Sequence, residues 1–136
     1  MNGELVAAIE TDQELWSNRL RITELWVTEK YQKQGIGRGL IEMAKEQARR
    51  ERRRAIILET QSCNVNAIDF YQYHGFSLIG MDTCCYKNND LQRKEVRLEF
   101  GWFLEEKKRL NKEEIEIRME TRSDWYNVEL MTNSHT

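Results

Sequence analysis

A chain of 136 residues with 40% hydrophobic residues can build one domain around a single core, which argues against two separate domains. Its 21 Lys and Arg against 23 Asp and Glu leave a net charge of -2, so no general basic field favours nucleic acid as the main partner. No run approaches the roughly 18 apolar residues needed to cross a bilayer, and residues 1–10 lack a leader pattern, so we expect a cytoplasmic protein without a membrane partner.

Two strands are predicted at the start of the chain. Residues 4–10, ELVAAIE, form a short apolar run, and the polar TDQELWSN after it predicts a turn. In the next strand Leu20, Ile22 and Trp26 share one face by the period of two, and Glu24 falls among them, which predicts a partly buried carboxylate. The run that follows Glu24 is apolar on both faces, as is typical of a covered central strand.

A polar turn rich in glycine separates this strand from a predicted helix. Its apolar residues lie on one stripe: Ile36, Leu40, Met43 or Ala44, and Ala48. The helix ends in an arginine cluster at 49–54, which we interpret as cations that complement the helix dipole rather than as a nucleic-acid patch. Residues 55–60, AIILET, predict a strand parallel to the one before the helix, so that the three elements form a βαβ unit.

The rest of the chain predicts a short helix and further strands. Asn64 and Asn66 are suitable N-caps for a helix that Gly75 ends. Residues 76–79 and 83–86 are interpreted as extended. Residues 94–104 alternate most regularly, with these side chains inward: Val96, Leu98, Phe100, Trp102 and Leu104.

The cysteines and histidines predict no metal site. Cys63, Cys84 and Cys85 are an odd number without ligand spacing, and we interpret them as reduced structural thiols, with Cys63 in packing and the other two on opposite faces of a strand. His74 and His135 are interpreted as surface residues, since neither has an evident partner.

Residues 24–38, ELWVTEKYQKQGIGR, predict an anion site. Glycines at 35, 37 and 39 let the backbone approach a ligand, and the first turn of the helix leaves N–H groups unpaired at the positive end of its dipole. A Walker loop is excluded because Arg38 and Gly39 follow Gly37, and a dinucleotide fingerprint is excluded because position 40 is Leu40. Plain turn glycines are the alternative.

The spacing Q-x-x-G-x-G, here Gln32, Gly35 and Gly37, resembles the acetyl-CoA motif of the GNAT N-acetyltransferase superfamily. Residues 64–76, NVNAIDFYQYHGF, resemble the downstream motif of the same family, in which an asparagine, an alanine, a tyrosine and a Gly-Phe keep fixed spacing. The LETQSCN run before it and the strand at 95–103 are similar to the streptothricin-acetyltransferase branch. The resemblance covers residues 4–104.

The resemblance implies an α/β (α+β) GNAT fold, a mixed and mostly antiparallel twisted sheet with a central parallel βαβ unit. Its two central parallel strands are expected to splay and admit the pantetheine arm of acetyl-CoA. Most GNAT domains begin with a strand, two helices and another strand, which this sequence does not show. We therefore expect an N-terminally truncated GNAT core over residues 1–104.

Residues 105–136 are expected to form a charged linker followed by a strand and a short helix. Residues 114–131, EIEIRMETRSDWYNVELM, resemble the opening of a GNAT domain. We hypothesise that they cover the sheet edge near residues 4–10, in the same chain or in a homodimer, because an open edge strand invites association. The alternative is the start of a second domain.

The resemblance also implies a set of binding residues. The backbone of Leu25, Trp26 and Val27 would pair with the pantetheine amides, and Asn64 would hydrogen-bond the same arm. The pyrophosphate would be wrapped by Gln32, Lys33, Gln34, Gly35, Ile36, Gly37 and Arg38. Tyr71 stands where the family often has the acid that protonates the departing thiolate.

Acetyl transfer to an amine requires a base and an acid. An alkylamine with a pKa of roughly 10 is mostly protonated at neutral pH, so a base must remove a proton. Glu24 is the candidate because burial beside Ile22 and Trp26 would disfavour its ionised form; a structural carboxylate bonded to a backbone amide is equally open. Tyr71, with an unperturbed pKa of about 10 against about 8.5 for a thiol, can be a neutral donor; a core aromatic is its alternative.

These predictions define an acetyl-CoA-dependent N-acetyltransferase that transfers acetyl directly to a primary amine of a small molecule, without a metal or a covalent enzyme intermediate. The branch resemblance points to a streptothricin-type antibiotic as the acceptor. The alternative, from another class, is a non-catalytic acyl-CoA-binding or dimerisation module left after loss of the acceptor-binding half.

Overall fold

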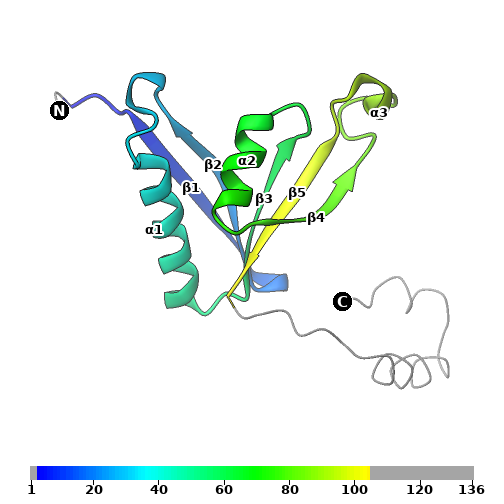
Figure 1. Ribbon diagram of the computed structural model, residues 1–136. Coiled ribbons are helices and arrows are strands. Elements are labelled where there is room, and N and C mark those ends of the chain that lie inside the picture. Colours follow the sequence, from blue (N-terminus) through cyan, green and yellow to red (C-terminus); the bar gives the residue numbers. More distant parts are fainter. Residues whose placement is uncertain (1–2, 105–136) are drawn as a thin grey trace, which may run out of the picture. The chain divides into compact units, whose positions relative to one another are not determined.

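The computed structural model describes residues 3–104, and the predicted linker, strand and helix of residues 105–136 lie outside this range (Figure 1). The elements follow in the order β1 (Ala7–Glu14), β2 (Arg19–Val27), α1 (Ile36–Glu51), β3 (Ala55–Gln61), α2 (Val65–Tyr73), β4 (Ser77–Asp82), α3 (Asp90–Arg93) and β5 (Arg97–Phe103), with 3-10 turns at Leu15–Ser17 and Glu29–Tyr31. No helix of the described range is long and apolar enough to cross a membrane.

The five strands form one sheet in the order β1-β2-β3-β5-β4. The central pair β2 and β3 is parallel, and the other three pairs are antiparallel. This confirms the predicted α+β fold, with a mixed, mostly antiparallel sheet around a βαβ unit. The parallel pair spans three residues of each strand, from Arg19 opposite Ala55 to Arg21 opposite Ile57. Beyond this point β2 and β3 diverge into two wings, one with β1, β2 and α1 and the other with β3, β5 and β4 (Figure 1).

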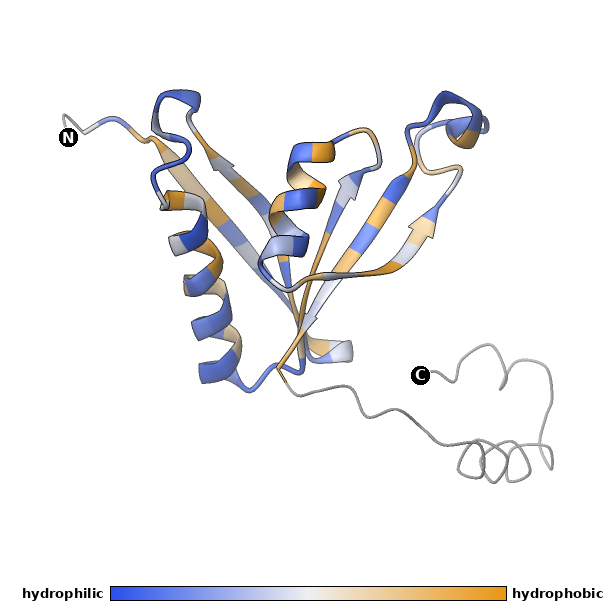
Figure 2. Ribbon diagram, viewed as in Figure 1, coloured by the Kyte–Doolittle hydropathy of each residue, from blue (hydrophilic) through white to orange (hydrophobic). Residues whose placement is uncertain are grey.

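The hydrophobic core lies on one face of the sheet, between the strands and the helices α1 and α2. α1 buries Ile41, Ala44 and Ala48, so the helix faces the sheet through Ile41 and Ala44 rather than through Met43, which is 63% exposed. The hydrophobic side of α1 is turned to the strands in Figure 2. Leu20, Ile22, Ile56, Leu58, Phe76 and Phe100 complete the buried cluster. The alternation predicted for β5 is confirmed, because Leu98, Trp102 and Leu104 pack on the same side as Phe100.

A bulge in β2 changes which side chains share a face. Glu10 lies opposite Glu24 and Thr11 lies opposite Ile22, so Thr23 has no residue opposite it in β1. One extra residue reverses the alternation of the strand beyond it. Leu25 therefore packs on the core together with Ile22, whereas Trp26 does not. The prediction that Leu20, Ile22 and Trp26 share a face is wrong for this reason.

Other boundaries also differ from the sequence predictions. β1 continues to Glu14 through the polar residues predicted as a turn, since they pair with β2 as far as Arg19. Residues 83–86 are a turn and not a strand. Asp90, which is fully buried, accepts hydrogen bonds from the backbone N–H groups of Tyr86 (2.8 Å) and Lys87 (2.7 Å) and thereby holds this loop. The sequence pattern of the polar run KNND does not predict this role.

The face of the sheet opposite α1 and α2 carries a ladder of ion pairs. Arg21 contacts Glu14 of β1 (3.3 Å) and Glu99 of β5 (3.4 Å). Glu99 also pairs with Arg97 (2.8 Å). Arg19 pairs with Glu14, and Arg97 pairs with Glu59 of β3. Alternating charges thus cross four strands on the face opposite α1 and α2. The hydrogen bond to Glu99 contributes most to raising the pKa of Arg97, followed by the hydrogen bond to Cys85 and then by the charge of Glu59.

Candidate functional site

The splayed part of β2 offers backbone hydrogen-bonding groups. The N–H of Thr28 donates to the carbonyl of Val6 (2.7 Å), so this residue turns its backbone groups toward β1. Backbone N–H and C=O groups alternate in direction along a strand. Those of Trp26 therefore also point toward β1, whereas those of Leu25 and Val27 point to the side where β3 has diverged. β2 pairs with β3 only as far as Arg21. Leu25 and Val27 therefore present backbone groups to the gap between the wings.

The turn before α1 has the conformation of an anion site. Gly35 is the N-cap residue, with φ +86° and ψ 2°, a left-handed geometry that a glycine adopts without strain. Lys33 is also left-handed, with φ +63°. Gln32 donates from Nε2 to the carbonyl of Val27 (2.9 Å), which ties the turn to the end of β2. The conformation of the turn is therefore fixed by contacts within the chain and needs no ligand.

The first turn of α1 leaves backbone donors without partners in the described part of the chain. The first helical bond runs from the N–H of Gly39 to the carbonyl of Gly35 (3.0 Å), and no side chain caps the helix. The N–H groups of Ile36, Gly37 and Arg38 consequently have no acceptor within residues 3–104. Together with the helix dipole, these donors favour an anionic group at this end of α1.

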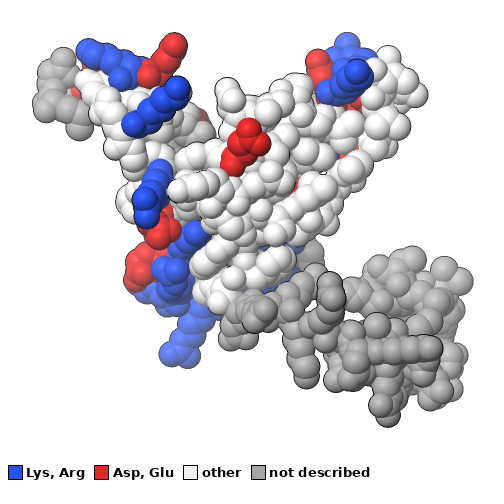
Figure 3. All heavy atoms as spheres, in the orientation of Figure 1, with Lys and Arg blue, Asp and Glu red and all other residues white. Residues whose placement is uncertain are grey.

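Exposed basic side chains surround this turn. Lys30, Lys33 and Arg38 are all exposed. In the space-filling view a notch separates the two wings, and basic side chains gather on the wing that carries the turn (Figure 3). The charge beside the turn therefore has the sign that a phosphate requires.

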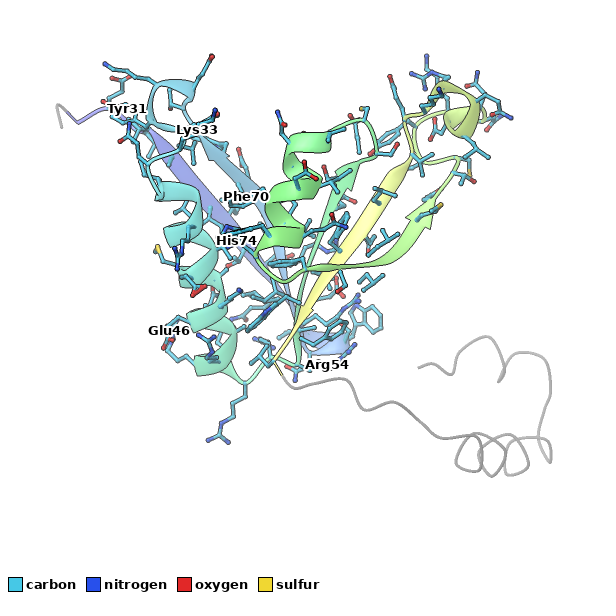
Figure 4. All side chains as sticks on the ribbon, viewed as in Figure 1. Tyr31, Lys33, Glu46, Arg54, Phe70 and His74 are labelled. Carbon is cyan, nitrogen blue, oxygen red and sulfur yellow. The ribbon has the colours of Figure 1, made fainter. Side chains whose placement is uncertain are left out.

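Gly37 has a packing role that the sequence did not reveal. A Cβ at this position would lie 3.2 Å from two ring atoms of Phe70 on α2. The glycine therefore lets α2 approach the first turn of α1. In Figure 4, Phe70 and His74 point from α2 toward α1. Gly39 has no neighbour within 4 Å and instead lines a groove of about 540 Å³ between α1 and β1, away from the turn.

Asn64 starts α2. Its Oδ1 accepts a hydrogen bond from the N–H of Ala67 (3.2 Å), which confirms the predicted N-cap. The Nδ2 group has no partner among the described residues and can donate to a ligand. Asn64 is exposed and follows the end of β3, on the opposite side of the splay from β2.

Tyr71 lies on α2 and packs on the core. Its ring meets Phe70 edge-on, with centroids 5.5 Å apart, and is tilted against Phe76 at 5.8 Å. Burial raises the pKa of the Tyr71 phenol above its usual value. No residue of the described range hydrogen-bonds its hydroxyl, so a neutral O–H is free to donate. The residue is a core aromatic and a candidate acid at once.

Glu24 does not have the environment that the sequence predicted. It is exposed, because the bulge at Thr23 places it on the face of the sheet opposite α1 and α2 and not beside Ile22. The prediction of a partly buried carboxylate is wrong. It lies opposite Glu10 of β1, whose carboxylate accepts a hydrogen bond from the Thr23 hydroxyl (2.6 Å). The remaining argument for Glu24 as a base is its position in the part of β2 that has diverged from β3.

His74 and the cysteines also differ from the sequence predictions. The His74 ring is half-buried, 4.5 Å from that of Phe70; burial lowers its pKa, and the charges of Lys45 and Arg38 lower it further. Cys63 is exposed rather than packed, as are the free thiols of Cys84 and Cys85. His135 lies outside the described residues. The described range contains no group of three or more metal-ligating side chains.

Comparisons with known proteins identify the family. The sequence model of the acetyltransferase (GNAT) family matches residues 1–76. The streptothricin acetyltransferase of Escherichia coli is 34% identical over 103 residues, 76% of this chain and 59% of that protein. Streptothricin acetyltransferase A of Bacillus subtilis is 34% identical over 73 residues, 54% of this chain and 42% of that protein.

Comparison with solved structures gives the same family. A structure described as a streptothricin acetyltransferase of Bacillus anthracis, in complex with acetyl coenzyme A, has a TM-score of 0.69 at 31% identity, with 77% of this chain and 59% of that chain covered. Nourseothricin acetyltransferase has a TM-score of 0.68 at 28% identity, with coverages of 76% and 61%.

The chain has the GNAT fold, in which the glycine turn and the uncapped helix α1 connect the splayed parallel strands β2 and β3, and it belongs to the GNAT acetyltransferase family. Its similarity is to the streptothricin acetyltransferases. The chain spans 59% of the length of the Escherichia coli relative.

Proposed function

We propose that the protein is an acetyl-CoA-dependent N-acetyltransferase that acts on a primary amine of a small molecule. The observation that carries the proposal is the uncapped first turn of α1, which lies beside the splay of β2 and β3 with Asn64 and Tyr71 on the following helix. These groups fit the two ends of a long ligand, since one end needs anion donors and the other needs strand-like backbone pairing and a proton donor.

The cofactor would be held along β2 and at the start of α1. Leu25 would exchange backbone hydrogen bonds with the pantetheine amides, and the N–H of Val27 would donate to them, since the Val27 carbonyl already accepts from Gln32. Trp26 would flank them from the position next to β1. The free amides of Ile36, Gly37 and Arg38 would bind the pyrophosphate, with Lys33 and Arg38 adding charge and Gly35 setting the turn. Gln32 would act through its bond to Val27, and Gln34 would complete the turn.

Asn64, the N-cap of α2, and Tyr71 within α2 would face the other side of the ligand. The Nδ2 group of Asn64 would donate to the pantetheine arm, because its Oδ1 already caps the helix. The raised pKa of Tyr71 keeps its phenol protonated at neutral pH, so it would donate a proton where negative charge develops.

Acetyl-CoA supplies an acetyl group activated as a thioester. The neutral amine forms a C–N bond to the acetyl carbon as the C–S bond breaks, and the electron pair of that bond leaves with sulfur. Tyr71 gives the thiolate its proton, directly or through water. Glu24, on the face opposite α1 and α2, would take the proton that the attacking amine loses. Atoms and charge balance over the cycle when Glu24 releases this proton to water and Tyr71 takes one back from water.

The test of the base is Glu24→Gln. If Glu24 removes the proton from the amine, the substitution lowers kcat by about a hundredfold and abolishes the acid limb of the pH profile of kcat/KM. The matched control is Glu10→Gln, since Glu10 lies opposite on β1. An unchanged acid limb in Glu24→Gln would remove the residue from the mechanism.

A panel of amines separates an enzyme from an acyl-CoA-binding module. Release of the CoA thiol is followed for streptothricin and for simple alkylamines, and turnover of at least one amine is the expected result. Streptothricin is included because the relatives carry that name. Tight binding of acetyl-CoA with no turnover on any amine would support the module instead.

We also propose a cytoplasmic homodimer. Among the described residues β4 has no neighbour on its outer side, and Leu78 and Met81 on this strand are 50% and 58% exposed. An apolar edge strand favours association. The free thiols Cys63, Cys84 and Cys85 suit a reducing compartment. Sedimentation equilibrium at micromolar concentration is expected to give the mass of two chains, and a monomer mass would contradict the proposal.

A further inference from the structure

α2 is held in place by few contacts. None of its nine residues is fully buried, although Ile68, Phe70 and Tyr71 are partly buried against the core. Phe70 lies against Gly37 near the start of α1. The opposite end of α2 needs a separate attachment, because a short helix with little buried surface gains little stability from packing.

Lys45 of α1 supplies that attachment. Its Nζ donates a hydrogen bond of 2.9 Å to the carbonyl of His74, the residue that caps the C-terminus of α2. A cation at this end satisfies an otherwise unpaired helix carbonyl and complements the helix dipole. The Lys45 side chain is only 12% exposed, and its nearest carboxylate, on Glu42, is 3.7 Å away. The ammonium group therefore depends on the carbonyl as its close partner.

Trp102 of β5 contacts the same ammonium group through the face of its ring. The Nζ of Lys45 lies 4.8 Å from the centroid of the Trp102 ring, a cation–π distance. The ring also borders Gly75, where a Cβ would stand 3.3 Å from the indole Cδ1. Lys45, Trp102 and the His74 carbonyl thus join α1, β5 and the end of α2.

Arg49 provides an internal comparison. Its guanidinium lies 5.6 Å from the centroid of the same Trp102 ring, one helical turn beyond Lys45. It pairs with Glu46 (3.7 Å) and is 53% exposed. Both cations lie over the ring, and among the described residues only Lys45 donates to the carbonyl of His74. Variants of the two residues can therefore separate the effect of the hydrogen bond from the effect of the cation–π contact with Trp102.

We propose that Lys45 is a positioning residue for acetyl transfer, which fixes α2 against α1 through the His74 carbonyl and so sets the place of Tyr71. This rests on the proposed function. Lys45 is nine residues beyond the start of α1, about 13 Å at 1.5 Å per residue, so it does not touch the turn at Gly35. Its loss would shift the proton donor and leave the anion site in place.

The surroundings of His74 lower the pKa of its imidazole, first through burial and then through the charges of Lys45 and Arg38. Lys45, Arg38 and Glu42 of α1 face the ring, and the aromatic rings of Phe70 and Tyr73 contact it from α2. Burial and the two cations keep the imidazole neutral. A neutral His74 does not repel the ammonium that binds its carbonyl.

The experiment compares Lys45→Met with Arg49→Met in the full chain. Methionine keeps an unbranched side chain over the Trp102 ring and removes the charge and the donor. Lys45→Met is expected to lower kcat about tenfold with the KM for acetyl-CoA changed less than about twofold, the pattern of a misplaced reacting group. Arg49→Met is expected to keep both constants within about twofold of the wild type. Lys45→Arg, which retains a donor, is expected to recover part of kcat.

Hydrogen exchange gives a readout that needs no activity. Backbone amides of residues 68–76 are expected to exchange about tenfold faster in Lys45→Met than in Arg49→Met, the scale of one charge-assisted hydrogen bond. Equal exchange in the two variants, or equal loss of kcat, would overturn the proposal. If the wild type acetylates no amine, the proposed function fails, and the positioning role for catalysis is overturned with it even where exchange shows that Lys45 holds α2.

Discussion

Tyr71→Phe is expected to lower kcat by about a hundredfold or more, the range in which one positioned acid contributes. The substitution removes only the hydroxyl, and the phenyl ring keeps its contacts with Phe70 and Phe76. Because burial raises the pKa of Tyr71, the donor form persists to higher pH than that of an exposed tyrosine, and any fall in the wild-type rate through loss of this proton is shifted to correspondingly higher pH. The measurement is CoA thiol release in saturating acetyl-CoA.

The matched control for Tyr71→Phe is Tyr73→Phe. Tyr73 lies on the same helix but is 82% exposed, so loss of its hydroxyl is expected to leave kcat and KM unchanged. Equal rates for Tyr71→Phe and the wild type would show that solvent protonates the thiolate and would leave Tyr71 as a core aromatic.

Gly35→Ala is expected to weaken acetyl-CoA binding by about tenfold and to destabilise the protein by about 1–2 kcal/mol. A Cβ at Gly35 meets no neighbour within 4 Å, so the cost comes from the left-handed φ of +86° and not from a clash. Relief of that strain moves the turn and with it the donors at Ile36, Gly37 and Arg38. The Kd is measured by calorimetry, and stability by denaturant unfolding.

Gly39→Ala is the control for that prediction. Gly39 is inside α1, has an ordinary φ and also has no neighbour within 4 Å. Alanine there is expected to stabilise the protein by about 0.5–1 kcal/mol and to leave the Kd unchanged. A Kd that rises equally in both variants would mean that the turn at Gly35 has no special part in binding.

Local patterns were sufficient to predict most of the fold. The period-2 run of β5 and the strand, helix and strand from β2 to β3 need only side-chain alternation and helix spacing, and both are confirmed. The end of α2 at Gly75, with φ +93°, follows from the same kind of local signal.

The errors concern features that depend on the pairing of distant residues. The bulge at Thr23 exists only because β1 pairs with β2 in a given register, and nothing in the β2 sequence marks it. Without the bulge, Glu24 and Trp26 were placed beside Ile22. The polar continuation of β1 to Glu14 was missed for a related reason, since its charges are satisfied by Arg19 and Arg21 of the neighbouring strand.

The candidate site was predictable in its parts but not in its assembly. The free donors at the start of α1 follow from the glycine turn, and the N-cap role of Asn64 follows from its position. The contact between Gly37 and Phe70 joins two motifs 33 positions apart, and the sequence gives no sign of it. The sequence predicts Gly37 to give access to a phosphate, whereas its neighbour in the structure is the aromatic ring of Phe70.

The central claim is that the gap between β2 and β3 binds acetyl-CoA, and calorimetric titration of the wild-type chain with acetyl-CoA tests it most directly. The account predicts one site per chain with a Kd in the micromolar range, and a Kd that rises as salt is added because phosphates meet Lys33, Arg38 and the donors of α1. Absence of binding at millimolar acetyl-CoA would contradict the account, and the acyltransferase and the acyl-CoA-binding module would be excluded together.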